Sequence, residues 1–210
     1  MAEGRAGGSS PWGFVLAACA AHLALVVSTS HVFVADAPNY ASDIAEHLGG
    51  YSCRFYEFGH LLWRPLGAGV TVLAHDVQEG APGARVVLSR LDALATVFGF
   101  GAVAALSAWL YLAAPTLGGA VVGVALLLAG KAFLNFSQVG TSYVPALALL
   151  SLGLLLLWRA AERERGRAPR ALAAGCALSL SVLLWAPFAL AVPGALLSAL
   201  MLRGTSRRVV

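Results

Sequence analysis

The segment VPALALLSLGLLLLWRAAERERGRAPR, residues 144–170, joins a continuous apolar run to a charged end. Residues 144–158 contain no charged side chain, and a transmembrane helix needs about 20 mostly apolar residues. Residues 159–170 hold five arginines and two glutamates, and loops rich in basic residues stay on the cytoplasmic side of a membrane. The segment therefore predicts a membrane span that ends in a cytoplasmic loop.

The composition of the whole chain agrees with this interpretation. Of the 210 residues, 59% are hydrophobic and 11% are charged, whereas soluble domains carry about 25% charged residues. The mean hydropathy is +0.79. The net charge of +4 does not indicate a nucleic-acid partner, because the basic residues gather at 159–170 and 203–208. We therefore expect an all-α, multi-pass protein of the cell membrane.

The other apolar runs predict the remaining helices of the bundle. After a flexible start at 1–10, the predicted helices are 11–34, 91–114, 117–138 and 144–158, with a long and mostly polar loop at 35–90. The last run, 171–202, is too long for one span of about 30 Å at about 1.5 Å per residue. Pro187 and Pro193 can break it into a hairpin. The prediction is a bundle of five to six spans within 11–202, followed by a basic tail at 203–210.

The basic loop at 159–170 also fixes the predicted orientation. Counting back from it places the loop 35–90 outside the cell and the N-terminus in the cytoplasm. The first apolar run lacks a clear small-residue cleavage site, so we interpret it as a membrane anchor rather than a signal peptide.

Loop 35–90 holds six of the ten acidic residues and three of the five histidines. Asp36 directly follows the first apolar run, where a carboxylate could meet the head group of a lipid-borne substrate or simply mark the end of a helix. Asp43 and His47 are four residues apart, so they share one face of a predicted short helix. That pair could help to hold a metal ion, or the two side chains could only contact each other.

The stretch YEFGHLLWRPLG, residues 56–67, is too apolar for free solution and short for a span. It predicts an interfacial or re-entrant helix with Tyr56 and Trp63 at the level of the lipid head groups. On such a helix Glu57, His60 and Arg64 would line one face, and arginine can bind phosphate with two parallel hydrogen bonds. The alternative is that Arg64 extends to the membrane surface and His60 packs without a chemical role.

A lysine interrupts the apolar run 117–138. Charged groups at membrane depth are costly and often mark functional sites, so Lys131 could face a substrate cavity or extend to the outer surface. Tyr143 lies near the same predicted outer edge.

Three stretches resemble one family of enzymes. ADAPNYASDIAEH (35–47), FGHLLWRPLG (58–67) and SYVPALALLSLGLLLL (142–157) resemble segments of the GT-C class of membrane glycosyltransferases, especially its bacterial members that are similar to protein O-mannosyltransferases. The resemblance covers roughly residues 11–200. It implies transfer of a sugar from a polyprenyl-phosphate donor to an extracytoplasmic acceptor.

The resemblance also implies roles for individual residues. Asp36 would be the general base, with Asp43 as second choice, because carboxylates are ionised at neutral pH. The substrate-binding set would be Glu57, His60, Arg64, Lys131 and Tyr143, with Arg64 and His60 at the phosphate. Members of the class usually place a divalent cation or basic residues there.

Two departures from the family pattern leave other functions open. Members of the class usually have more spans, and loop 35–90 here lacks an adjacent Asp-Glu pair. The alternatives are a small transporter, or a non-catalytic, shortened relative that acts as a membrane partner subunit. In each case the chain contacts membrane lipid.

Overall fold

The computed structural model describes residues 11–29, 36–51, 55–74, 82–162, 166–194 and 196–197. Its elements are α1 (Trp12–Ser28), α2 (Asp36–Leu48), α3 (Trp63–Leu73), α4 (Ala84–Ala113), α5 (Leu117–Ala129), α6 (Lys131–Phe136), α7 (Tyr143–Glu162), α8 (Arg167–Leu184) and the short 3-10 helix η2 (Ala186–Leu190). Every element in the described part of the chain is helical, which confirms the all-α prediction.

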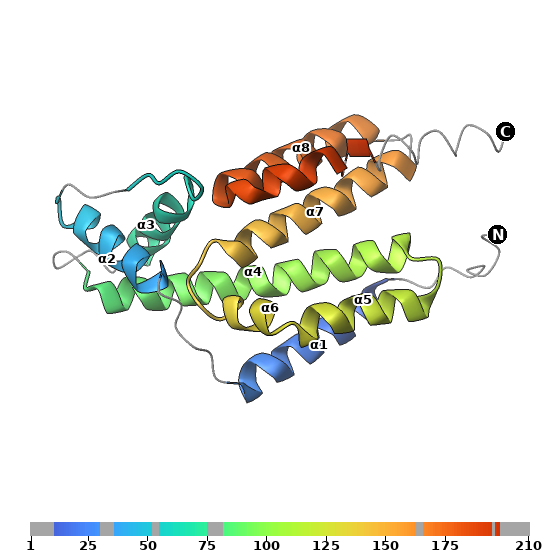
Figure 1. Ribbon diagram of the computed structural model, residues 1–210, viewed down its shortest axis with the longest axis horizontal. Coiled ribbons are helices and arrows are strands. Elements are labelled where there is room, and N and C mark those ends of the chain that lie inside the picture. The colour runs from blue at the N-terminus through green and yellow to red at the C-terminus, as the bar shows by residue number, and fades with distance from the viewer. Residues whose placement is uncertain are drawn as a thin grey trace.

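Three helices, α4, α7 and α8, are long and apolar enough to cross a membrane. They run side by side, with α1 and α5 along the free side of α4 (Figure 1). α1 and α5 are also apolar but have only 17 and 13 residues. At about 1.5 Å per residue, α5 is roughly 20 Å long, less than the hydrocarbon thickness of about 30 Å. The prediction of five to six spans therefore stays a prediction.

Helix α4 begins at Ala84, seven residues before its predicted start. Its 30 residues extend for about 45 Å, so one end can project well beyond a bilayer. Arg85, Arg90 and Asp92 made this end resemble a loop in sequence, but Val87 and Leu91 are fully buried against α2 and α3. The projecting turns of α4 pack against α2 and α3, at the left of Figure 1. Loop 35–90 is therefore largely helical where the structure describes it, and the short helix predicted around Asp43 and His47 is confirmed as α2.

The core of this helical end forms between α2, α3 and the start of α4. The buried face of α2 consists of Ala37, Tyr40, Ala41 and Ile44, which is the spacing of an amphipathic helix. Trp63 packs against this face and is fully buried. Its indole N–H donates to the carbonyl of Gly140 at 3.1 Å, so the polar atom is satisfied inside the protein. Trp63 therefore contacts protein rather than lipid head groups, and its level in a bilayer stays a prediction.

Two glycines of α3 provide a matched test of this packing. A Cβ on Gly67 would lie 2.6 Å from a methyl carbon of Leu91 and 2.8 Å from one of Ile44, whereas a Cβ on Gly69 would meet nothing within 4 Å. Both neighbours of Gly67 are fully buried and have little room to move. We expect Gly67→Ala to lower the free energy of unfolding by about 1–2 kcal/mol, because overpacking strains a core.

Gly69→Ala should instead raise the free energy of unfolding by roughly 0.5 kcal/mol, because alanine favours the helix. Thermal unfolding of both variants in the same detergent measures the difference. Equal midpoints for the two variants would show that α3 does not dock on α4 at Gly67.

Two breaks shape the rest of the bundle. The predicted single helix 117–138 was wrong, because the chain leaves helical geometry at Gly130 and separates α5 from α6. The run 171–202 breaks at Trp185, whose φ of −151° and ψ of 100° are extended. Residues 189–194 and 196 then lie beside 175–183, and the two stretches line a common groove. The described residues therefore show a break and a return beside α8, whereas the predicted hairpin of two spans stays a prediction.

Candidate functional site

The connection between α6 and α7 is where distant parts of the chain meet. Residues 137–142 are all buried although they form no regular element. Gln138 donates to the hydroxyl of Thr29 at 3.4 Å, just after α1. The N–H of Gly140 donates to Asp92 of α4 at 2.7 Å, and its carbonyl accepts from Trp63 of α3. This buried connection thereby ties α1, α3 and α4 to the start of α7.

Position 140 must be glycine, because α4 lies too close to leave room for a side chain. A Cβ there would overlap the Cβ of Leu91 and lie 3.1 Å from its carbonyl carbon. Because both main-chain groups of Gly140 have partners, the buried backbone is satisfied despite the absence of regular structure. The connection is therefore held in one conformation, and the next two residues, Thr141 and Ser142, are fully buried.

Asp36 and Tyr143 meet where α2 and α7 begin. The Tyr143 hydroxyl donates to a carboxylate oxygen of Asp36 at 3.2 Å. Asp36 occupies the first turn of α2, where the helix dipole favours a negative charge. Tyr143 also makes edge contacts with the rings of Phe136 at 4.9 Å and Trp185 at 5.2 Å. The carboxylate thus lies at the border between polar groups and a set of aromatic rings.

Arg64 is held by two carboxylates. Its Nε and Nη2 lie 2.8 and 2.7 Å from Oδ2 of Asp43, and its Nη1 lies 2.8 Å from Oε2 of Glu57. The guanidinium also lies 4.8 Å from the ring centre of Tyr40. Burial alone would lower the pKa of Arg64, but the hydrogen bonds to Glu57 and Asp43 outweigh it and raise the pKa. Arg64 is 5% exposed, so this cation is committed to contacts within the protein.

His60 is fixed through one ring nitrogen. Its Nδ1 lies 2.7 Å from the hydroxyl of Ser142 and 3.3 Å from the carbonyl of Leu184. The hydroxyl of Ser142 can donate to Nδ1, and Nε2 then carries the proton and can donate to another group. The His60 ring also lies 5.9 Å from the ring of Tyr143. His60 is therefore close to the residue whose hydroxyl binds Asp36.

The predicted helical face of Glu57, His60 and Arg64 was wrong. Residues 57–62 precede α3 and are not helical, and Gly59 has a φ of +100° that interrupts any helix there. Glu57 and Arg64 nevertheless come together across the turn as an ion pair. His60 joins the neighbouring group around Ser142 and Tyr143 instead.

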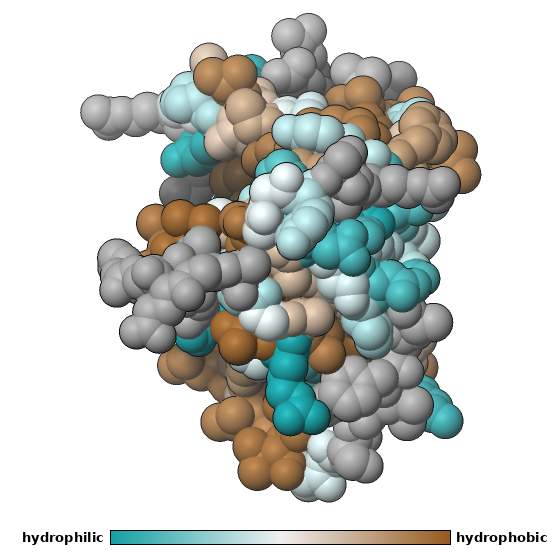
Figure 2. All heavy atoms as spheres, turned by 90° about the vertical axis from the view of Figure 1, so that its left-hand side faces the viewer, coloured by the Kyte–Doolittle hydropathy of each residue, from teal (hydrophilic) through white to brown (hydrophobic). Residues whose placement is uncertain are grey.

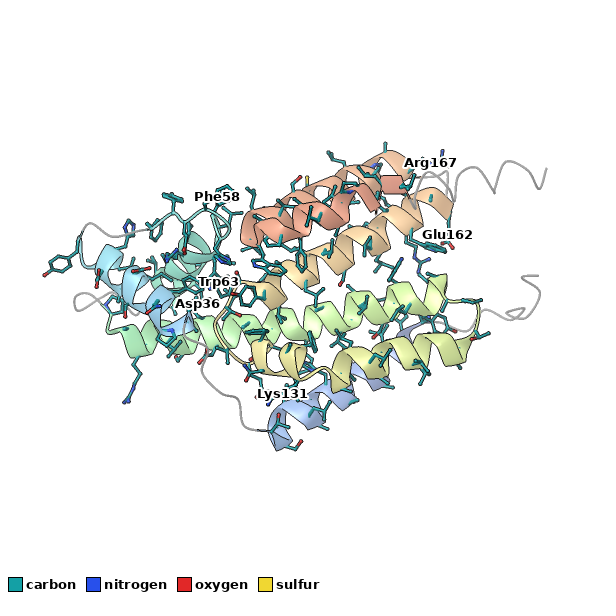
Figure 3. All side chains as sticks on the ribbon, viewed as in Figure 1. Asp36, Phe58, Trp63, Lys131, Glu162 and Arg167 are labelled. Atoms are coloured by element: carbon teal, nitrogen blue, oxygen red, sulfur yellow. The ribbon has the colours of Figure 1, made fainter. Side chains whose placement is uncertain are left out.

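The remaining predicted residues lie around this centre. His47 stacks on the ring of Phe55 at 3.8 Å, and its predicted neighbour Asp43 binds Arg64. Within the described ranges, no three His, Cys, Asp or Glu side chains gather in a way that could hold a metal ion. Lys131 is exposed at the first position of α6, and Figure 3 shows it apart from Asp36 and Trp63.

An apolar groove of about 440 Å³ adjoins the polar groups. It is lined by Ala132, Phe133, Phe136, Tyr143, Val144, Leu147, Trp185 and Phe188. Tyr143 belongs to both features, because its ring lines the groove while its hydroxyl binds Asp36. The site therefore combines a carboxylate and an imidazole with an adjoining apolar, largely aromatic surface.

Sequence reasoning missed four participants in this arrangement: Tyr40, Asp92, Ser142 and Trp185. Three of them carry no local pattern that separates them from ordinary helix or turn residues. Asp92 is the exception, because an acidic residue at the start of a predicted span could have been singled out.

No family model matches this chain, and no curated protein or solved structure resembles it at a significant level. The chemistry of the site is therefore inferred from its geometry.

Proposed function

We propose that this protein is a membrane-embedded glycosyltransferase that moves a sugar from a polyprenyl-phosphate donor to an extracytoplasmic acceptor. The observation that carries the proposal is the double role of Tyr143, which binds Asp36 and lines the apolar groove. A lipid-linked sugar needs both features, because its tail is apolar and its reacting carbon is attached to a polar head.

The proposed orientation puts this site outside the cell. Asp36 and Trp63 lie at one end of the bundle, and Glu162 and Arg167 lie at the other (Figure 3). The arginine-rich segment around Arg167 belongs in the cytoplasm, which puts α2, α3 and the candidate site on the opposite side. Figure 2 looks onto that end, where hydrophilic side chains are interspersed with hydrophobic ones.

In the proposed reaction Asp36 is the general base. It takes the proton of the acceptor hydroxyl, and the oxygen forms a new bond to the anomeric carbon from the face opposite the phosphate. The bond between that carbon and the phosphate oxygen breaks, and polyprenyl phosphate leaves with the electron pair. The transfer inverts the configuration of the sugar. Asp36 must come within hydrogen-bond reach of the acceptor, as a general base requires.

The contacts of Arg64 support Asp36 rather than Asp43 as the proposed base. Asp43 already binds two guanidinium nitrogens of Arg64, so its negative charge is compensated within the protein. We therefore assign the role of general base to Asp36. A phosphate at Arg64 would have to displace Asp43 or Glu57. We therefore assign the phosphate contact first to His60 and to Lys131, which precedes the groove residue Ala132.

Two substitutions separate the two roles of Tyr143. Tyr143→Phe keeps the ring in the groove and removes the hydroxyl that binds Asp36. We expect donor affinity to stay within about 3-fold and the rate of transfer to fall about 10- to 150-fold, because a hydrogen bond to a charged group contributes about 1.5–3 kcal/mol. Tyr143→Ala should weaken donor binding as well. Titration and single-turnover rates on both variants measure this separation, and equal losses of affinity in the two variants would argue against it.

The break at Gly130 favours one alternative, a small transporter, because interrupted helices line substrate paths in transporters. Substrate uptake into sealed vesicles without loss of the sugar would support that alternative.

A further inference from the structure

The loop between α2 and α3 presents an exposed aromatic side chain next to the candidate site. Phe58 is 93% exposed. Glu57 and His60 on either side of it are bonded inward, to Arg64 and to Ser142. Gly59 turns the backbone between them with a φ of +100°, a conformation that glycine adopts readily. The loop therefore holds two polar groups in the site while Phe58 lies on its outer side (Figure 3).

Backbone hydrogen bonds fix the level of this loop along the bundle. The carbonyl of Gly59 accepts from Ala186 at 3.0 Å, and the N–H of Leu62 donates to Leu183 at 3.3 Å. Leu183 belongs to the last turn of α8, and Ala186 begins η2 just after it. Helix α8 has 18 residues and so spans about 27 Å, close to the hydrocarbon thickness of about 30 Å. With the arginine-rich start of α8 at one membrane surface, Phe58 lies at the boundary on the other side.

We propose that Phe58, together with Tyr56 and Leu61, is a membrane anchor that inserts into the outer leaflet at the head-group boundary. The inference rests on the proposed placement of α8 across the bilayer, but not on sugar transfer. Tyrosine favours this depth, phenylalanine and leucine form the inserted face of interfacial segments, and apolar surface gains free energy by leaving water. Leu180 and Leu183 of α8 are exposed as well, and they face the bilayer in the same placement.

The anchor has a consequence for the site. Because Glu57 and His60 flank Phe58, lipid that holds Phe58 also limits the movement of both polar groups. The bilayer then supports the ion pair with Arg64 and the contact with Ser142. The partner is the lipid surface itself.

Spin labels at three positions test the anchor in the full-length chain. Cys19, Cys53 and Cys176 are first replaced by alanine, and a nitroxide is attached to Phe58→Cys, Leu126→Cys or Tyr51→Cys. Each protein is placed in phosphatidylcholine–phosphatidylglycerol vesicles, and relaxation by oxygen is compared with relaxation by a water-soluble nickel chelate. Leu126 and Tyr51 are matched references, because both are 70% exposed. Leu126 is on the apolar helix α5, and Tyr51 follows the end of α2 that lies away from α7 and α8 (Figure 1).

We expect oxygen to relax the labels at 58 and 126 more than nickel does, and the reverse at 51. A label at 58 that behaves like the one at 51 would overturn the anchor, and so would a label shielded from both reagents, which would indicate a protein contact. If the label at 126 is also open to nickel, the placement of the helices fails and the anchor fails with it. A lipid-exposed label at 58 in a protein that transfers no sugar would support the anchor and refute only the proposed function.

Discussion

Replacing Arg64 with methionine is expected to lower the free energy of unfolding by about 3 kcal/mol, the lower end of the range for breaking a buried ion pair. The lower end applies because Glu57 is 47% exposed and water screens its share, whereas the side chain of Asp43 is only 27% exposed. Methionine fills much of the same space, so the loss reports the ion pairs rather than a cavity. Thermal unfolding in a fixed detergent, followed by circular dichroism, measures the effect.

Substitution of the two carboxylates that bind Arg64 shows which ion pair accounts for the loss of stability. Asp43→Asn should destabilise the protein more than Glu57→Gln, because Asp43 binds two nitrogens of Arg64 and is less exposed. The double variant Arg64→Met with Asp43→Leu should recover most of the loss, because the less exposed carboxylate is then removed together with the cation, and Glu57 remains about half-exposed to water. If Arg64→Met unfolds with the wild-type midpoint, the three side chains do not hold α2, α3 and the loop together.

Replacing Asp36 with asparagine should reduce sugar transfer by about 10²- to 10⁴-fold, the contribution typical of a general base. The amide oxygen of asparagine can still accept the hydrogen bond of Tyr143, so the fold and the binding of the donor should remain. Release of labelled sugar from a panel of polyprenyl-phosphate hexoses, under single-turnover conditions, measures the change.

Asp43→Asn is the matched control for this substitution. It removes the same charge from the same helix, but it should slow transfer only as far as it reduces the folded fraction. A rate for Asp36→Asn within about 10-fold of wild type would assign proton removal to another group.

The long helices of this fold could be predicted from the sequence, because continuous apolar runs are a local signal. The turn at Trp185 was accessible in the same way, since prolines mark the end of a helix. The break at Gly130 was not, because a lone glycine in an apolar run is compatible with a continuous helix. The start of α4 was missed because Arg85 and Arg90 look like loop residues until the helix is seen to carry α2 and α3.

The candidate site was predicted only in part. The sequence indicated the polar residues of the external segment, and Asp36, His60 and Arg64 do lie at one end of the protein. Their arrangement depends on the buried connection 137–142, which binds residues distant in the chain through backbone groups of Gly140 and the hydroxyl of Ser142. Such contacts leave no periodic pattern. Because the sequence does not show that Asp43 and Glu57 bind Arg64, the guanidinium was predicted as a phosphate ligand.

Binding of a lipid-linked sugar is the most direct test of the central claim. We would expose the purified protein in detergent to polyprenyl-phosphate sugars and record intact complexes by native mass spectrometry, with Asp36→Asn and Ala132→Trp in parallel. Ala132 is exposed and lines the groove, so a tryptophan there should block the lipid tail without disturbing the core. The account predicts one bound donor on wild type and on Asp36→Asn, and loss of the complex for Ala132→Trp. A protein that binds none of these donors, or that binds them equally well when the groove is filled, would contradict it.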